Sequence, residues 1–250
     1  MVNHALRLAA AVVVLVPLSA CGSPGASDSH VVVFAASSLK RAFTEIGQQF
    51  MAENPDEEVE FTFAGSADLL SQLTNGAPGD VFAPADTATM DKAVRAGLTE
   101  GEPRPFASNR LTIVVAPGNP KNVTSLRSLE RPGVTVVVCA PQVPCGAATR
   151  KVESAAGVRI VAASEESQVS DVLTKVTSGQ ADAGLVYVTD AIAAGSAVTA
   201  VDFPESAGAV NTYSIALLKG TAKSAPARVF RDYVIGAAGQ RVLASVGFQP

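Results

Sequence analysis

The chain has 250 residues, of which 48% are hydrophobic and 17% charged, and this composition excludes a disordered polymer. Its 19 basic and 23 acidic residues give a net charge of −4, which leaves no basic surface for nucleic acid. Two His and three Cys are too few for most metal sites built from imidazole or thiolate. We expect a globular protein of one large domain or two lobes, with no cofactor.

The first 20 residues have the pattern of a signal peptide. Arg7 precedes an apolar run over residues 8–16, which is shorter than the roughly 20 residues of a membrane-spanning helix. The run ends in Leu18-Ser-Ala-Cys21, which resembles a bacterial lipobox, where cleavage precedes a lipidated Cys. An ordinary secretory signal is the alternative. We expect a signal peptide at 1–20 and a flexible tether at 21–29, with the mature body, from His30, lipid-anchored on the outer face of the cell membrane.

Strands and helices alternate along the rest of the chain. The continuous apolar run at 31–36 is typical of a strand buried on both faces, and apolar residues at helical spacing follow over 39–53. Further strands are predicted at 59–64, 80–84, 111–116, 134–139, 158–162, 183–188, 198–203 and 213–218. Further helices are predicted around 69–73, at 87–96, near 126, at 147–156 and 169–178, from 190, and within 225–243.

This alternation predicts an α/β fold of parallel sheets with helices on both faces. The strands form two series, over residues 31–106 and 111–201, and the last stretch adds elements that are expected to return to the first series. We therefore predict two lobes of mainly parallel sheet with flanking helices, hinged around a central ligand cleft. Lobe 1 would comprise residues 30–108 plus 202–250, and lobe 2 residues 109–201.

Four junctions between a strand and a helix carry small or polar residues. They lie at Ser37-Ser38, at Gly65-Ser66, at Cys145-Gly146 and at Ser167-Gln168-Val169. Each places free backbone N–H groups and a helix N-terminus at the carboxyl end of a strand, where anions bind. Ordinary helix capping is the alternative for each junction. Tyr187 ends another predicted strand, where it either adds a hydroxyl to the same site or serves as a wall residue.

Cys139 and Cys145 remain as a pair if Cys21 is acylated. The segment between them is short and contains two prolines, and a disulfide is the preferred interpretation for an oxidising compartment. Two buried free thiols are the first alternative. A metal site is the second, although two thiolates alone cannot complete a zinc coordination shell.

Several motifs resemble those of the molybdate-binding proteins of ABC importers, in order and over nearly the whole mature chain. They are Phe34–Leu39, Phe63–Ser66, Gly76–Phe82 with Asp86, Gly184–Ala191 and Gly239–Phe248. The resemblance implies the type II periplasmic-binding-protein fold, with two α/β lobes that close on a tetrahedral oxyanion. By motif position it implies that the ligand donors are the hydroxyls of Ser38, Ser66 and Tyr187 and the main-chain N–H groups of Cys145 and Val169. The family often has a small residue where Cys145 stands, and a backbone contact tolerates that change.

The resemblance implies a solute-binding lipoprotein that delivers molybdate to a membrane permease without a chemical step. Molybdate, tungstate and sulfate are deprotonated near neutral pH and only accept hydrogen bonds, so a pocket made only of donors suits them. Hydrogenphosphate carries a proton and needs an acceptor. Tungstate is nearly the size of molybdate, and both remain candidate ligands. We expect a monomer, and we expect Asp68 to face solvent because a carboxylate in the site would repel the anion.

Three other functions are considered. A binding protein for sulfate or another oxyanion fits the same junctions, and a lipoprotein that only docks partners fits the signal and tether. Ser37-Ser-Leu-Lys40 matches the S-x-x-K pattern of penicillin-interacting serine enzymes. Lys219-Gly-Thr221 resembles the K-T-G motif of the same enzymes, but its last two residues are in the wrong order. The Ser-Asp-Asn element of that group is missing, so an acyl-enzyme is a remote alternative.

Overall fold

The first of two five-stranded sheets has the strand order β2-β1-β3-β10-β4. The computed structural model describes residues 30–221 and 223–250. The strands are β1 (His30–Ala36), β2 (Glu58–Ala64), β3 (Val81–Ala83), β4 (Thr99–Asn109) and β10 (Asn211–Leu218). Strand β1 runs parallel to β2 and β3, whereas β10 is antiparallel to β3 and β4.

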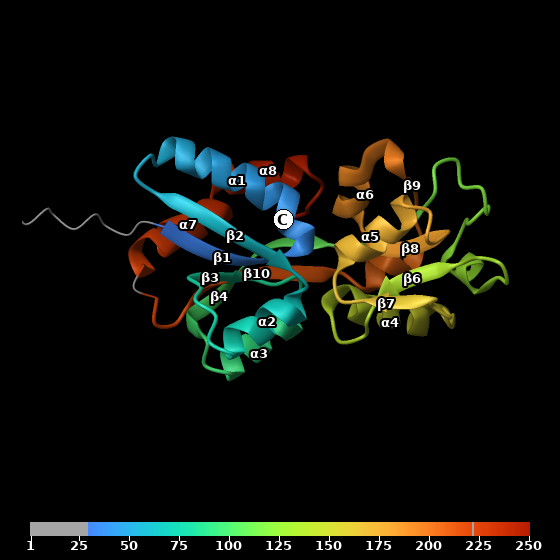
Figure 1. Cartoon of the computed structure of the whole chain (residues 1–250), viewed down its shortest axis with the longest axis horizontal. Coiled ribbons are helices and arrows are strands. Elements are labelled where there is room, and N and C mark those ends of the chain that lie inside the picture. Colours follow the sequence, from blue (N-terminus) through green and yellow to red (C-terminus); the bar gives the residue numbers. More distant parts are fainter. Residues whose placement is uncertain (1–29, 222) are drawn as a thin grey trace, which may run out of the picture.

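Helices cover both faces of this first sheet (Figure 1). They are α1 (Lys40–Glu53), α2 (Ser66–Thr74), α3 (Thr87–Arg95), α7 (Ser224–Ile235) and α8 (Ala237–Ser245). Phe43 of α1 and Phe230 of α7 pack in the core on one face, and Leu69 of α2 and Met90 of α3 pack in the core on the other. The apolar run of β1 is buried because each face of the sheet is covered. We call this sheet with its helices the first lobe.

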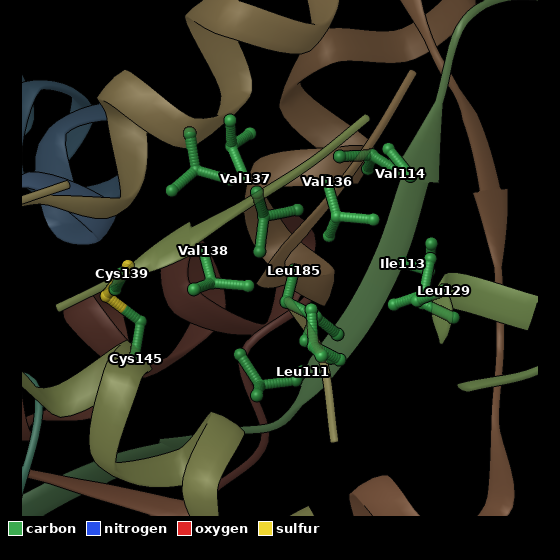
Figure 2. Close-up of a cluster of buried hydrophobic side chains, with 14 of the residues drawn as sticks. Leu111, Ile113, Val114, Leu129, Val136, Val137, Val138, Cys139, Cys145 and Leu185 are labelled. Carbon is green, nitrogen blue, oxygen red and sulfur yellow. A yellow bond between two sulfur atoms is a disulfide. The ribbon is translucent and has the colours of Figure 1, made fainter. Parts of the chain in front are cut away.

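The second sheet has the order β7-β6-β8-β5-β9 and forms the second lobe. Its strands are β5 (Leu111–Val115), β6 (Val136–Cys139), β7 (Ser164–Glu166), β8 (Ala183–Tyr187) and β9 (Thr199–Val201). Its helices are α4 (Pro144–Ala156), α5 (Val169–Thr177) and α6 (Val188–Ala194), with short 3₁₀ turns at Leu126–Glu130, Gly195–Ala197 and Pro204–Gly208. Figure 2 shows the Val and Leu side chains of β5, β6 and β8 that fill its core.

The two-lobed α/β architecture is confirmed, but the sheets are mixed rather than mainly parallel. Strand β5 is antiparallel to β8 and β9, as β10 is to β3 and β4. The reason lies in the connections between lobes: β4 continues almost directly into β5, and β9 leads back to β10. A strand that enters a sheet from the other lobe runs against its neighbours, because it does not arrive through a helix crossover.

Three local predictions are corrected. Residues 158–162 form no strand, and the edge strand comes later, at β7. Strand β4 was not predicted, because its outer half is exposed and carries Gly101 and two prolines. The chain returns to the first sheet at Asn211 rather than at Asp202, since Phe203 and Ala209 still pack in the core of the second lobe.

No helix within the described ranges 30–221 and 223–250 is long and apolar enough to cross a membrane. The predicted signal peptide, the tether and Cys21 lie outside those ranges.

Candidate functional site

A small cavity lies between the two lobes, where four helical segments begin. From the first lobe it is lined by the 3₁₀ turn Ser37–Leu39, which precedes α1, and by the start of α2. From the second lobe it is lined by the starts of α4 and α5. The first N–H groups of a helix have no partner within the helix, and they carry its positive dipole end. The four predicted junctions therefore meet at one place, and that place suits an anion.

All five predicted ligand residues line this cavity: Ser38, Ser66, Cys145, Val169 and Tyr187. The structure thus brings together positions up to 149 residues apart in the chain, from both lobes. Cys145 is the second residue of α4 and Val169 the first of α5, so both offer first-turn N–H groups. No charged side chain is among the residues that line the cavity in the described part of the chain.

Tyr187 carries the most informative polar atom of the site. It ends β8 and lies at the N-cap of α6, and only 1% of the residue is exposed. Its hydroxyl oxygen is buried and has no hydrogen-bond partner among the described residues. Burial raises the pKa of the Tyr187 hydroxyl well above its usual value, so the group keeps its proton and remains a donor. A buried hydroxyl without a partner is costly to the fold, and a bound oxyanion would satisfy it.

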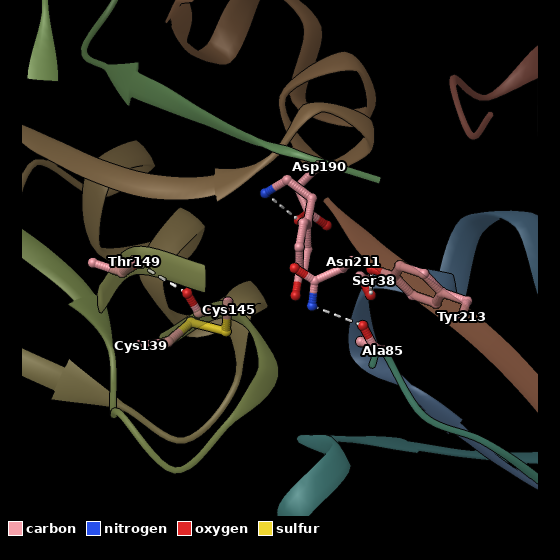
Figure 3. The surroundings of a disulfide bond; sticks show 9 residues. Ser38, Ala85, Cys139, Cys145, Thr149, Asp190, Asn211 and Tyr213 are labelled. Atoms are coloured by element: carbon pink, nitrogen blue, oxygen red, sulfur yellow. Dashed lines mark hydrogen bonds between the residues drawn. A yellow bond between two sulfur atoms is a disulfide. The ribbon is translucent and has the colours of Figure 1, made fainter. Parts of the chain in front are cut away.

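The two serine hydroxyls are both buried and both hydrogen-bonded. Ser66 Oγ accepts from the backbone N–H of Ala85 at 3.0 Å, and Ser38 Oγ lies 3.0 Å from Tyr213 Oη. Figure 3 shows Ser38 beside Tyr213, and Asn211 bonded to the Ala85 carbonyl. Sequence reasoning missed Ala85 and Tyr213, because neither belongs to a junction motif and their contacts span distant parts of the chain.

A disulfide joins Cys139, at the end of β6, to Cys145 in the first turn of α4, with their Cα atoms 5.6 Å apart. Figure 3 shows this bond, with Thr149 donating to the Cys145 carbonyl. The bond ties the start of α4 to the end of the strand before it. It therefore restrains one of the four helix starts that line the cavity.

Two acidic side chains flank the site without entering it. Asp68 is exposed in the first turn of α2, as expected. Asp190 is partly buried, and its carboxylate accepts from the Tyr187 N–H at 3.0 Å. Burial raises the pKa of Asp190 to about 7, although the Tyr187 N–H acts in the opposite direction. Neither residue lines the cavity.

The lobes touch at the cavity, and its free volume is about 10 Å³. That is about the space that one water molecule needs, so a tetrahedral oxyanion can enter only if the lobes move apart and close again. Asn109 in the first sheet donates to Thr189 of α6 at 2.8 Å, and it lies where the chain crosses between lobes. Motion about this crossing would open the cavity.

Larger hollows are also present, and one of them shares Ser37 and Ser38 with this cavity. One of about 600 Å³ between α1 and α6 is lined by two basic and two acidic side chains among others, Lys40, Arg41, Glu45 and Asp190, and this balance of charge does not select for an anion. Another of about 470 Å³ in the first lobe includes Lys219 and Thr221. The two halves of the acyl-enzyme pattern therefore lie at separate hollows. Among residues 30–221 and 223–250, no cluster of three or more His, Cys, Asp or Glu side chains is placed to hold a metal ion.

Comparisons with known proteins agree with this geometry. Residues 31–249 match the family described as bacterial extracellular solute-binding protein. The molybdate-binding protein ModA of Mycobacterium tuberculosis H37Rv is 54% identical over 232 residues, covering 93% of this chain and 89% of the relative.

Two solved structures have the same fold. The periplasmic molybdate-binding protein of Azotobacter vinelandii superposes with a TM-score of 0.78 at 23% identity, covering 88% of this chain and 99% of that one. The sulfate-binding protein SubI of M. tuberculosis superposes with a TM-score of 0.76 at 19% identity, covering 89% and 87%. Because both identities are low, these structures establish the fold but do not discriminate between ligands.

Proposed function

The chain belongs to the bacterial extracellular solute-binding protein family, and from that premise we propose that it captures molybdate between its lobes and delivers it to the permease of an ABC importer. The observation that carries the proposal is the buried, unpartnered hydroxyl of Tyr187 at an inter-lobe cavity. The 54% identical molybdate-binding relative supports molybdate in particular. Sulfate is the alternative ligand.

The chemistry of the cavity favours a fully deprotonated oxyanion. The hydroxyls of Ser38, Ser66 and Tyr187 and the N–H groups of Cys145 and Val169 are all able to donate. Hydrogen bonds to a charged group contribute about 1.5–3 kcal/mol each. Neutral hydroxyl and N–H donors also cost less to bury than the charged side chains of Lys or Arg. The ion is held by hydrogen bonds alone, and no chemical step follows its capture.

Titration calorimetry of the mature protein against four sodium salts tests the proposal. We expect heat and a tight complex with molybdate and with tungstate, which is nearly the same size. We expect weaker binding of sulfate, because donors that close around the larger molybdate ion make longer contacts with the smaller one, and no binding of phosphate near neutral pH. Absence of heat with every ion contradicts the proposal, and sulfate as the tightest ligand replaces molybdate with the alternative.

We further propose that the mature protein is a monomer attached to the outer face of the cell membrane through lipid on Cys21. The lipobox pattern and the polar segment after it support the anchor. Wild-type protein expressed in a bacterium should partition with membranes and carry a labelled fatty acid. The Cys21→Ser variant should lose the label, and a label that persists there contradicts the anchor. Sedimentation velocity of the unlipidated protein tests the monomer.

A further inference from the structure

The serine hydroxyls at the cavity each have a hydrogen-bond partner behind them. For Ser66 the direction of the bond is fixed, because the Ala85 N–H can only donate. A serine hydroxyl has one hydrogen and two lone pairs. With one lone pair occupied by the amide, the hydrogen of Ser66 stays available to the cavity. Asn211 holds the Ala85 segment by donating to the Ala85 carbonyl at 2.9 Å.

For Ser38 the partner is a second hydroxyl, so either oxygen could donate on geometry alone. A bound oxyanion would determine the direction of the hydrogen bond between Ser38 and Tyr213. A deprotonated oxyanion only accepts, so Ser38 must spend its single hydrogen on the ion and must accept from Tyr213. Burial raises the pKa of Tyr213 above its usual value, which keeps its proton in place for donation.

Tyr213 is held rigidly for this task. It is fully buried on β10, and its ring packs at steep angles against Phe248, Phe106 and Tyr187, with centroids 5.3, 6.4 and 6.1 Å away. Tyr213 does not line the cavity itself. Its hydroxyl therefore acts on a ligand through a neighbouring side chain. Ser38, at 3.0 Å, is the cavity residue to which it is hydrogen-bonded, and Tyr187 and Asn109 also lie close enough to influence its pKa.

We propose that Tyr213 is a positioning residue for the oxyanion, which donates to Ser38 and thereby fixes the Ser38 hydroxyl as a donor into the cavity. This inference rests on the proposed function. Hydrogen bonds in a chain strengthen one another, so Tyr213, Ser38 and the ion form a cooperative series. Without the Tyr213 hydroxyl, the Ser38 hydroxyl can rotate in the ligand-free protein. Binding then has to fix its orientation, and this loss of rotational freedom weakens the affinity for the ion.

Calorimetry with molybdate on wild type, Tyr213→Phe, Ser38→Ala and the double variant tests the inference. We expect Tyr213→Phe to weaken binding about tenfold and Ser38→Ala by at least as much. We expect the double variant to bind like Ser38→Ala, because Tyr213 acts through Ser38. Tyr233→Phe is the matched control, since that hydroxyl contacts Glu53 on the outer surface of the first lobe, and its affinity should equal that of wild type.

Wild-type affinity in Tyr213→Phe, or fully additive losses in the double variant, overturns the inference. If Tyr213→Phe does not fold, two unnatural residues at position 213 replace it. 4-Methylphenylalanine fills the space of the hydroxyl without a donor and should weaken binding, whereas 4-aminophenylalanine keeps a donor and should preserve it. Equal affinities of these two variants also overturn the inference. A wild-type protein that fails to bind molybdate contradicts the proposed function instead.

Discussion

A β-carbon added to Gly65 would lie 2.2 Å from the backbone carbonyl oxygen of Ser167. Gly65 precedes α2 in the first lobe, and Ser167 precedes α5 in the second. The φ angle of Gly65 is −60°, which any residue can adopt, so crowding rather than backbone conformation requires glycine here. The Asp68 carboxylate, 3.1 Å from the added carbon, is an exposed side chain that can move, whereas the Ser167 backbone of the other lobe cannot. Both residues line the cavity, so a larger residue at position 65 would keep the two lobes further apart there.

Gly65→Ala is therefore expected to weaken molybdate binding while leaving each lobe folded. The added methyl group opposes only the closed state, and overpacking costs about 1–3 kcal/mol, which corresponds to a loss of roughly 5- to 150-fold in affinity. Calorimetry measures the affinity, and small-angle scattering with molybdate should show a more open molecule than wild type. Gly208→Ala is the control, because a β-carbon there meets nothing within 4 Å. Equal affinity of the two variants would show that closure does not require Gly65.

Tyr187→Phe is expected to keep or raise the stability of the ligand-free protein and to lower its affinity for molybdate. The hydroxyl has no hydrogen-bond partner among residues 30–221 and 223–250, so its removal should leave the melting temperature of the ligand-free protein unchanged or higher. The same change removes one donor to the ion and should weaken molybdate binding by about 10- to 100-fold. Thermal unfolding with and without molybdate measures both effects. A variant that melts lower without ligand and binds normally would show that the hydroxyl has a structural partner instead.

Asp190 is expected to make stability depend on pH. Its pKa in the folded protein is about 7, against an ordinary value of 3.8, so the folded state binds this proton more tightly than the unfolded state. The resulting stabilisation is complete below about pH 4 and is lost as the pH rises through about 7. Asp190→Asn does not titrate and can still accept from the Tyr187 N–H. Its melting temperature should therefore rise relative to wild type between pH 5 and pH 8.

The exposed Asp91 of α3 provides the control for that measurement. The difference in melting temperature between Asp91→Asn and wild type should stay constant over the same pH range. A constant difference for Asp190→Asn as well would mean that Asp190 is already ionised at pH 5 in the folded protein.

Removal of the disulfide is expected to reduce both stability and affinity. Closing a loop of this length contributes about 2 kcal/mol to the free energy of unfolding in the chain-entropy treatment. Cys139→Ser with Cys145→Ser should lose that amount in urea unfolding and should bind molybdate more weakly, because the start of α4 is released. A reductant should produce both losses in wild type and neither in the double variant. Unchanged affinity in the double variant would show that the bond stabilises the fold without shaping the site.

The amino-acid sequence by itself determined most of the elements and the residues at the cavity. The apolar run of β1, the helical spacing in α1 and the polar residues at the strand ends are local patterns, and local patterns report burial and capping directly. Because ligands of open α/β sheets sit at the carboxyl ends of strands, these patterns also located the site. Ser66 and Val169 needed only this reasoning and the resemblance of the motifs.

The tertiary structure decided what depends on contacts between distant residues. The direction of β10, the bond between Ser38 and Tyr213 across 175 positions and the approach of Gly65 to Ser167 leave no local pattern. Strand direction follows from how the chain crosses between lobes, and a hydroxyl's orientation follows from whatever packs behind it. These relationships arise only when two cores are packed and brought together, and they determine which groups are free to hold an ion.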